Sequence, residues 1–374
     1  MSRKNLFLAL SLFVVASMLL SACTGGAPAP AAQPKGPAEA QQTGGEKIVE
    51  NPLTPQAQTA EATAVPAPAA GEKKHKIGVI QITLEHEYQK TLNEGFKAQA
   101  AKEGVDVVFC INNLKPEDHV KCGDDLIAAG VNVIIQAPAD PASFKAVADK
   151  ALAKGIPVVN DGSPQPKMPG VVPFIGTDSL GGGKLAGEFA ADWINKNLGG
   201  QAVVAELTLP TFTDCVARNK GFDEALAAGA PGAKIVARQD GNGLRPKALQ
   251  VTEDMLQGNP DINVIFGCND DSALGALSAL QAAGKDPAKT LVIGFDGTNG
   301  AFREIQNGGM FRADIVQRPD LISRRQMEIA VQIARGEKKV EDFPDPTYIK
   351  TPVVTTDNVA QWLEWNGDPA KAPK

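Results

Sequence analysis

The stretch KIGVIQITLEHEYQKTLNEGFKAQAAKEGVDVVF, residues 76–109, decides the fold of this chain. It contains a short apolar run at 76–80, an amphipathic segment at 87–103 and a second apolar run at 105–109. Short apolar runs that alternate with helical patterns are typical of strand–helix–strand units in a parallel sheet. Gly104 lies just past the expected helix, where glycine adopts a left-handed turn at little cost.

The same alternation continues to residue 175 and then starts again. The first set continues with expected helices at 116–129 and 143–154 and expected strands at 131–135, 156–159 and 171–175. The second set has expected helices at 185–197, 219–228, 246–257, 273–283 and 301–307, and expected strands at 202–207, 234–237, 263–266, 291–294 and 312–316. The sequence therefore predicts an α/β protein with two doubly wound, Rossmann-like lobes in tandem.

The N-terminal segment predicts export. Two basic residues precede an apolar run at 6–20, which is shorter than the roughly 20 residues of a membrane-spanning helix, so we interpret residues 1–22 as a signal peptide. Leu-Ser-Ala-Cys, residues 20–23, resembles the lipobox of bacterial lipoproteins. This resemblance implies a mature chain that starts at Cys23 and is lipid-anchored to the outer face of the cell membrane, in the periplasm or at the cell surface. The alternative is an ordinary signal peptide with an incidental cysteine.

Residues 23–71 consist mostly of Ala, Pro, Gln, Gly and Thr. Such a segment has too little apolar surface to offset its ordering entropy, so we expect a disordered tether. About 300 residues follow it, enough for two domains of ordinary size.

Charge and cysteine usage exclude several kinds of partner and site. The net charge of −6 argues against nucleic acid as a partner. Without Cys23 the chain has four cysteines, which permits disulfides in an exported protein but allows three pairings. There is no C-x-x-C pair and only three histidines, so we expect no metal centre and no cofactor.

Ligands of open parallel sheets bind outside the carboxyl ends of the strands. In this chain, the segments that follow the expected strands are rich in Asn, Asp, Gln and Arg. They comprise residues 81–89, 110–114, 136–140, 160–163, 208–218, 239–245, 267–271, 295–298 and 317. Such side chains form bidentate hydrogen bonds to vicinal hydroxyls, which indicates a site for a polyhydroxylated ligand.

Five phrases together resemble a known family. They are IFGCNDDSALGA at 265–276, VIGFDG at 292–297, DSLGGGKLAG at 178–187, RNKGF at 218–222 and ADIVQ at 313–317. In this order and spacing they resemble the ribose-binding-protein branch of the type I periplasmic binding proteins, which deliver sugars to ABC importers. The resemblance covers about residues 76–349.

The resemblance implies two lobes joined by a three-segment hinge near Asp178, Gln317 and Thr347. The first lobe would comprise residues 76–178 and 318–346, and the second residues 179–317 and 347–374. Carried over position by position, the pattern makes sugar-hydroxyl ligands of the second-lobe residues Arg218, Asn269, Asp296 and Gln317.

Each of these four residues has a purely structural alternative. Asp296 could initiate a turn, Arg218 could form a surface ion pair, and Gln317 could serve only the hinge. Asn269 or one of the aspartates at 270–271 could cap the next helix. We expect an aspartate to cap and Asn269 to bind.

The first lobe matches the family less well. Where the family places an Asn and two aromatics, this chain has His86, Tyr88 and Gln89, and where the family has an Asp-Arg pair it has Gly162-Ser163. We therefore take His86, Tyr88 and Asp161 as candidate ligand residues. An aromatic expected near residue 243 is a glycine, so a polyol or another monosaccharide fits as well as ribose.

The cysteines also fit this fold. Cys215 and Cys268 follow the first and third strands of the second lobe, which are neighbours in a sheet of order 2-1-3-4-5. We hypothesise a Cys215–Cys268 bridge beside the site and a Cys110–Cys122 bridge in the first lobe. The glycines at 181–183 do not satisfy the phosphate-loop pattern, and we interpret them as loosening the crossover between the lobes.

The expected function is capture of a small ligand by hinge closure, followed by docking of a monomeric binding protein on an ABC transporter permease. A receptor that presents a bound furanose or sugar to a sensor is an alternative. The same core occurs in sugar-responsive repressors, but no helix-turn-helix precedes residue 76 and the chain is expected to be exported. An exported enzyme is disfavoured because no Ser-His-Asp arrangement lies at the strand ends, although cleft carboxylates leave hydrolysis open.

Overall fold

The computed structural model describes residues 48–49, 74–162 and 165–365. The expected signal peptide, the lipidated Cys23 and nearly all of the tether lie outside these residues. Among the helices described, none is long and apolar enough to cross a membrane.

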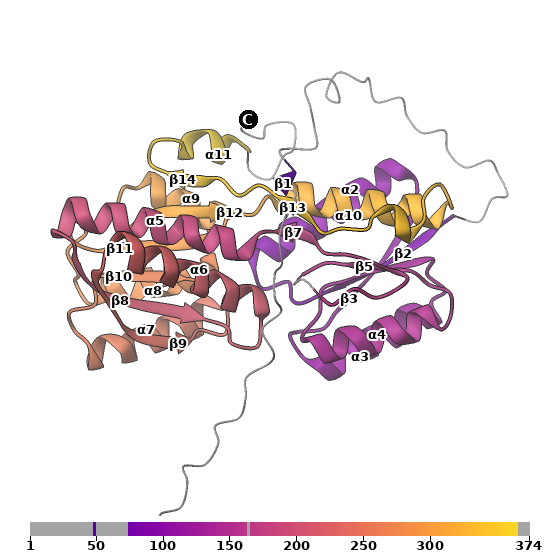
Figure 1. Ribbon diagram of the computed structural model, residues 1–374, viewed down its shortest axis with the longest axis horizontal. Coiled ribbons are helices and arrows are strands. Elements are labelled where there is room, and N and C mark those ends of the chain that lie inside the picture. Colours follow the sequence, from indigo (N-terminus) through magenta and orange to yellow (C-terminus); the bar gives the residue numbers. More distant parts are fainter. Residues whose placement is uncertain (1–47, 50–73, 163–164, 366–374) are drawn as a thin grey trace, which may run out of the picture. The chain divides into compact units, whose positions relative to one another are not determined.

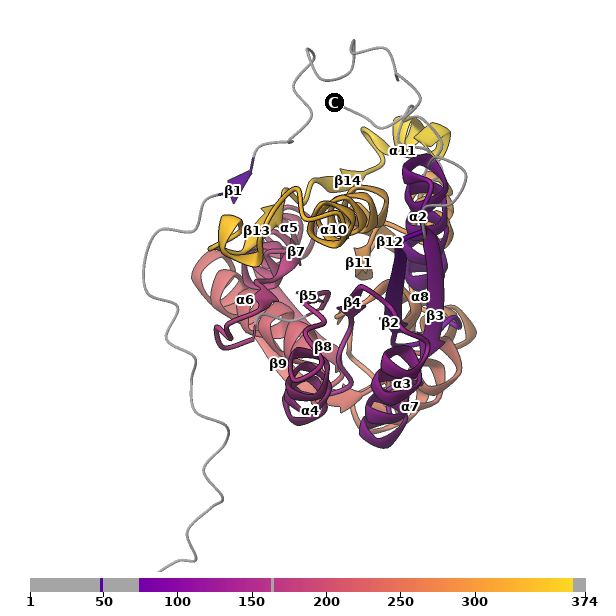
Figure 2. The same cartoon turned by 90° about the vertical axis from the view of Figure 1, so that its right-hand side faces the viewer.

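The first sheet has the strand order β3-β2-β4-β5-β6, with all strands parallel. In chain order these strands are β2 (Lys76–Gln81), β3 (Asp106–Ile111), β4 (Val133–Gln136), β5 (Val158–Asn160) and β6 (Val171–Val172). Its helices are α2 (Glu87–Glu103), α3 (Pro116–Ala128), α4 (Pro141–Leu152) and, from much later in the chain, α10 (Pro319–Ala334). Helices α2 and α10 lie side by side on one face, and α3 and α4 pack on the other (Figure 1, Figure 2). We call this unit the first lobe.

The second sheet has the order β14-β12-β11-β10-β8-β9, in which only β14 is antiparallel to its neighbour. Its strands are β8 (Gln201–Thr208), β9 (Gly232–Asp240), β10 (Val264–Gly267), β11 (Leu291–Asp296), β12 (Phe311–Val316) and β14 (Val353–Thr355). Its helices are α5 (Ser179–Leu198), α6 (Thr213–Gly229), α7 (Arg245–Gly258), α8 (Asp270–Ala282), α9 (Asn299–Gln306) and α11 (Val359–Trp365). We call this unit the second lobe.

Both sheets have the doubly wound order 2-1-3-4-5 when their parallel strands are counted along the chain, which confirms the predicted fold class. Helices cover both faces of each sheet, and the central strands are accordingly continuous apolar runs such as Val264–Gly267 in β10. Both sheets direct their carboxyl ends toward the same cavity, which is described below.

Between the two lobes lies a small parallel sheet of order β1-β13-β7. It consists of β1 (Ile48–Val49), β7 (Ile175–Thr177) and β13 (Thr347–Ile349). The chain passes from one lobe to the other after β7, after β12 and after β13. At the second of these passages Arg318 has a φ of 63° and donates to both carboxylate oxygens of Asp320, at 2.9 and 2.8 Å.

The glycines at 181–183 lie inside α5, so the expectation that they loosen the crossover is wrong. A Cβ on Gly183 would meet the carbonyl oxygen of Arg218, and one on Gly187 would meet that of Phe222. Arg218 and Phe222 both belong to α6, which packs against α5 along its length (Figure 1). The glycines therefore allow two helices to approach closely, and this packing stabilises helical turns that contain poor helix formers.

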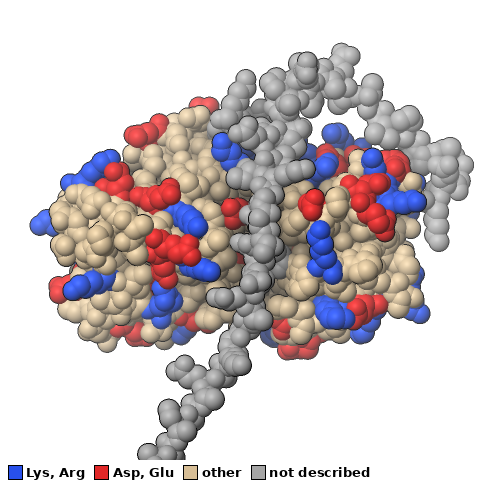
Figure 3. Space-filling view, in the orientation of Figure 1, with Lys and Arg blue, Asp and Glu red and all other residues tan. Residues whose placement is uncertain are grey.

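The charged surface mixes both signs. On the face shown in Figure 3, basic and acidic side chains are interspersed over both lobes. Several form short-range ion pairs, such as Lys196–Asp192 within α5 and Lys184–Glu224 between α5 and α6. Pairs as exposed as these contribute little to stability, on the order of 0–1 kcal/mol.

Candidate ligand-binding site

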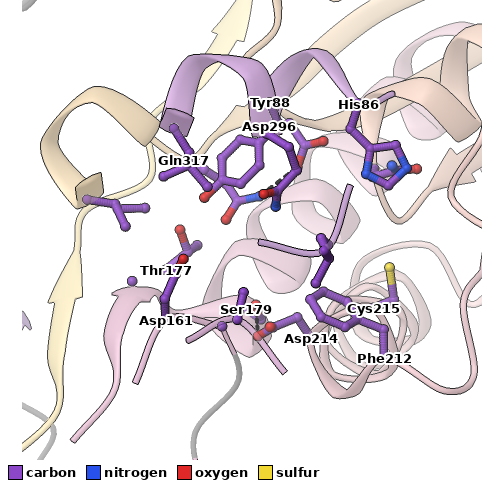
Figure 4. Close-up of a pocket in the computed structure, with 18 of the residues that line it drawn as sticks. His86, Tyr88, Asp161, Thr177, Ser179, Phe212, Asp214, Cys215, Asp296 and Gln317 are labelled. Atoms are coloured by element: carbon purple, nitrogen blue, oxygen red, sulfur yellow. Dashed lines mark hydrogen bonds between the residues drawn. The ribbon is translucent and has the colours of Figure 1, made fainter. Parts of the chain in front are cut away.

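One cavity is lined by the ligand residues that were predicted from the sequence. The volume of this cavity is about 70 Å³. It is lined from both lobes, and the lining includes all seven predicted ligand residues: His86, Tyr88, Asp161, Arg218, Asn269, Asp296 and Gln317. Figure 4 shows several of them projecting toward the cavity from different elements.

Arg218 occupies the second turn of α6, which begins six residues earlier than expected. Its Nη1 donates to the carbonyl oxygen of Cys268 at 2.7 Å, and its guanidinium lies 3.9 Å from the centroid of the Phe295 ring. Nη1 is also 3.6 Å from Oδ1 of Asp296, and both side chains are about 5% exposed. The alternative in which Arg218 forms a surface ion pair is therefore wrong. Arg218 is a buried cation that contacts Cys268, Phe295 and Asp296.

Asp296 ends β11 with a φ of 148°, a backbone conformation that side-chain-bearing residues rarely adopt. Its Oδ1 accepts from Nε2 of Gln317 at 2.6 Å. Burial raises the pKa of Asp296 well above its usual value, and Arg218 and Gln317 act in the opposite direction. A hydroxyl that donates to this carboxylate would relieve part of the cost of burying it.

Asn269 caps α8, contrary to the expectation that an aspartate would do so. Its Oδ1 accepts from the backbone N–H of Ser272 at 3.0 Å, and its Nδ2 donates to the carbonyl oxygen of Gly243 at 2.9 Å. The neighbouring Asp270 instead accepts from the N–H and hydroxyl of Thr298, at 2.9 and 2.8 Å. The Asn269 side chain still lines the cavity, but these bonds use half of its hydrogen-bonding capacity within the second lobe.

Two disulfides support the site and the first lobe. Cys215 of α6 is bonded to Cys268, which follows β10, with a Cα–Cα distance of 5.2 Å. Cys110 of β3 is bonded to Cys122 of α3, with a Cα–Cα distance of 5.5 Å. These are the two pairs hypothesised from the sequence. The first joins the two segments that carry Arg218 and its carbonyl partner.

The first lobe contributes groups with open hydrogen-bonding positions. Oδ1 of Asp161 accepts from Nε2 of Gln326 at 2.9 Å, whereas its Oδ2 is buried and has no partner. Burial raises the pKa of Asp161 to about 6, and the bond from Gln326 opposes this shift. Oδ2 is thus an acceptor without a donor, at the wall of the cavity.

The two remaining first-lobe candidates are at the start of α2. The His86 ring lies against Gly243 of the second lobe. A Cβ built on this glycine would be 3.5 Å from Nε2 of His86. Burial lowers the pKa of His86, which favours the neutral imidazole. Burial likewise raises the pKa of Tyr88 well above its usual value and keeps the phenol protonated.

The sequence did not single out several lining residues, among them Phe174, Thr177, Ser179, Phe212 and Asp214. Asp214 accepts from the hydroxyl of Ser179 at 2.8 Å. Phe212 and Asp214 lie in the segment after β8, residues 208–218, which was expected to border the site without a distinction between its residues. The polar composition of this segment was the signal that could have identified them. Phe174 and Thr177 belong to the crossover between the lobes, where the strand-end rule does not apply.

Within the described residues, no group of three or more His, Cys, Asp or Glu side chains is placed to hold a metal ion. The arrangement instead combines carboxylates, one guanidinium, amides and aromatic rings around one cavity. Such a set can bind hydroxyl groups by hydrogen bonds and the apolar face of a sugar ring by stacking.

Residues 77–338 match the periplasmic binding protein domain family. The chain belongs to this family. Among its curated relatives, the ribose import binding protein RbsB of Bacillus subtilis is 32% identical over 77% of this chain and 91% of its own length. The protein of the same name from Escherichia coli is 32% identical over 72% of this chain and 88% of its own.

Solved structures of this family resemble the chain over nearly their whole length. An ABC transporter solute-binding protein from Actinobacillus succinogenes, with bound D-allose, has a TM-score of 0.69 at 29% identity and covers 77% of this chain and 99% of its own. The Caulobacter myo-inositol binding protein, bound to myo-inositol, has a TM-score of 0.70 at 29% identity and covers 78% and 96%.

Proposed function

We propose that this protein is the extracytoplasmic sugar-binding component of an ABC importer. The observation that carries the proposal is the cavity, in which hydrogen-bonding side chains of two lobes face one small space. The similarities to known proteins support it, because proteins named for binding ribose or solved with D-allose or myo-inositol resemble this chain in sequence or in fold. Its role is binding and delivery rather than catalysis.

The proposed mechanism is capture by closure of the two lobes. Arg218, Asn269, Asp296 and Gln317 approach the ligand from the second lobe, and Asp161 approaches it from the first. Only the closed form offers both sets of contacts, so a ligand that bridges them shifts the population toward closure. The three passages of the chain after β7, β12 and β13 would act as the hinge.

The proposed ligand is one monosaccharide or polyol. Carboxylates at Asp161, Asp214 and Asp296 accept from hydroxyls, and Arg218 donates to hydroxyl or ring oxygens. A compound that lacks one of these hydroxyls would leave a buried polar group without a hydrogen-bond partner, which costs about 1–3 kcal/mol per group and gives sharp selectivity. Phe212 and Phe174 line the cavity in place of the aromatic that is absent at Gly243.

We further propose that the protein is exported, acylated on Cys23 and tethered by residues 23–71. A tether holds the binding protein near its permease and raises their effective concentration. We expect it to act as a monomer that docks in its closed form. Metabolic labelling with a fatty acid would detect the lipid, and Cys23→Ser would abolish the labelling.

Thermal unfolding of residues 24–374 in the presence of pentoses, hexoses, inositols, linear polyols, nucleosides and amino acids tests the function. A ligand that binds only the folded state raises the melting temperature. We expect a selective rise with one polyhydroxylated compound that is lost in Asp296→Ala and kept in Asp192→Ala, which removes an exposed carboxylate from α5. A response only to a nucleoside or an amino acid would contradict the sugar assignment.

A further inference from the structure

Outside the cavity, the lobes are also joined by Glu87, the first residue of α2. Its Oε1 accepts from the backbone N–H of Asn299 at 2.9 Å, and its Oε2 accepts from that of Gly300 at 3.4 Å. Oε2 is also 3.6 Å from Nη2 of Arg245. One carboxylate of the first lobe thus contacts two segments of the second.

The partner surface on the second lobe is built to receive an anion. Asn299 and Gly300 are the first residues of α9, where backbone N–H groups have no partner within the helix and the helix dipole is positive. Thr298 caps the next free N–H, that of Ala301, at 3.3 Å. Nε of Arg245 is held by Asp271 at 2.5 Å, which orients the guanidinium within its own lobe.

Glu87 is also connected to the ligand site through the backbone on both sides. Its sequence neighbours His86 and Tyr88 line the cavity. On the other lobe, Asn299 follows the turn that starts at Asp296, a ligand candidate with a constrained backbone. The contact therefore forms only when the start of α2 and the 296–299 turn are both in position around the cavity.

We propose that Glu87 is a positioning residue that latches the closed form, by binding the N-terminus of α9 and Arg245 across the mouth of the site. This inference rests on the proposed capture by closure. The latch forms after the ligand has entered, so it slows ligand release and leaves association unchanged. Within its own lobe, Glu87 lies in the first turn of α2, where its charge favours the helix N-terminus, and its backbone carbonyl accepts from the hydroxyl of Thr91 at 3.3 Å.

The test compares Glu87→Gln and Glu87→Ala with Glu94→Gln, which makes the same chemical change on the exposed part of α2. Fluorescent labels on cysteines introduced at the exposed Lys154 and Lys234 report the lobe separation, because the native cysteines outside the tether are in disulfides. D-ribose, D-allose and myo-inositol are added in turn, and stopped-flow mixing gives association and dissociation rates.

We expect Glu87→Gln and Glu87→Ala to release the ligand about tenfold faster at low ionic strength, with unchanged association and only a small loss of stability to urea in the ligand-free protein, because the first turn of α2 loses its carboxylate. Higher salt should narrow the difference, because the contact is partly exposed. Glu94→Gln should behave like the parent. Equal release rates for the parent and both Glu87 variants would overturn the proposal.

Removing the ion pair alone identifies the main contact. Arg245→Gln leaves the backbone N–H groups of α9 available to Glu87, so we expect release to stay much slower than in Glu87→Ala. Release as fast as in Glu87→Ala would assign the latch to the ion pair alone and overturn the role of α9.

Failure of the proposed function gives a different result from failure of the latch. If none of the three compounds changes the lobe separation of the parent protein, the sugar-capture function fails. The latch is then judged on the ligand-free protein, in which Glu87→Gln must lower the closed fraction at low ionic strength. Identical distributions for parent and variant would overturn it.

Discussion

The two lobes contribute to the site in different ways. In the second lobe, the candidate residues bind one another: Gln317 donates to Asp296, Asn269 caps α8, and Arg218 is held by Cys268 and Phe295. In the first lobe, Asp161 leaves a buried oxygen without a partner. The second-lobe groups are therefore held mainly by contacts within their own lobe, although Nε of Arg218 is, like Oδ2 of Asp161, buried and without a partner.

This difference also matches the pattern of the resemblance. Four second-lobe positions resemble the sugar-binding pattern, although Gly243 departs from it, and the first-lobe positions depart from it more. Since the second-lobe groups depend on one another, a change in one disturbs the rest. The first-lobe groups can change with less structural consequence, and we infer that they set the identity of the ligand.

The largest expected effect comes from removing the central cation of the second lobe. In Arg218→Met, Asp296 loses its buried partner, which should destabilise the fold by about 3–5 kcal/mol and weaken ligand binding on the order of 100-fold. Urea unfolding and calorimetric titration measure the two effects. Arg303→Met, which removes an exposed cation from α9, serves as the control. A variant with parental stability would show that Arg218 is dispensable to this network.

The two disulfides, one in each lobe, allow the lobes to be compared by the free energy of unfolding that each bridge contributes. Replacing Cys215 and Cys268 by Ala opens a loop closed over 53 residues, and replacing Cys110 and Cys122 opens one closed over 12. Loop-closure entropy predicts losses of about 4 and about 3 kcal/mol. Only the first pair should also weaken ligand binding, because it borders Arg218. Equal losses of affinity in both double variants would contradict the local role of Cys215–Cys268.

Asp161→Asn should separate stability from binding in the first lobe. The pKa of Asp161 is raised to about 6 in the folded protein against 3.8 for the free group, so the folded state holds the extra proton. Wild-type stability therefore falls as pH rises from about 4 to about 6, and the penalty persists above that. Two pKa units correspond to at most about 3 kcal/mol.

The variant cannot ionise at this position, so we expect it to be more stable than the parent at pH 7–8 and to bind the ligand more weakly. Unfolding free energies between pH 4 and pH 8 provide the comparison, and Asp149→Asn on the exposed face of α4 is the control. Parallel pH profiles for Asp161→Asn and the parent would falsify the assigned burial cost.

The smallest expected effect is at the contact between the lobes. Gly243 has a φ of 65°, and a Cβ there would make only ordinary contacts with His86 and Asn269. Gly243→Ala should therefore cost about 1–2 kcal/mol from the left-handed backbone alone. Its ligand affinity should stay close to that of the parent. A loss of affinity much greater than tenfold would show that the added methyl prevents His86 from reaching its closed position.

Much of the fold follows from local sequence patterns. The apolar runs and amphipathic segments predicted the five parallel strands of each sheet and most of the covering helices, because strands buried on two faces must be apolar throughout. They did not predict α10, α11 or β14. The segments just after the strands contain Arg218, Asn269 and Asp296, since parallel sheets bring their carboxyl ends together, and the family resemblance singled out these three residues within them. Neighbouring strands likewise made Cys215 and Cys268 the pair to expect.

Other features depended on contacts between distant segments. Helix α5 includes Gly183 because α6 packs against its backbone at that point, although glycine by itself disfavours a helix. Asn269 rather than an aspartate caps α8 because its amide also reaches Gly243, while Asp270 is occupied by Thr298. No local pattern distinguishes between residues of equal capping ability.

By itself, the sequence determined the fold class, the family and the end of each sheet at which the cavity lies, because these depend on periodicity, on the five phrases that resemble the family and on the polar residues at strand ends. Only the tertiary structure decided which polar atoms are already satisfied, which oxygen of Asp161 is open, and that Glu87 reaches the N-terminus of α9. Those outcomes depend on distances between residues as far apart in the chain as 87 and 299, and on burial, which shifts the pKa of carboxylates that look alike in the sequence.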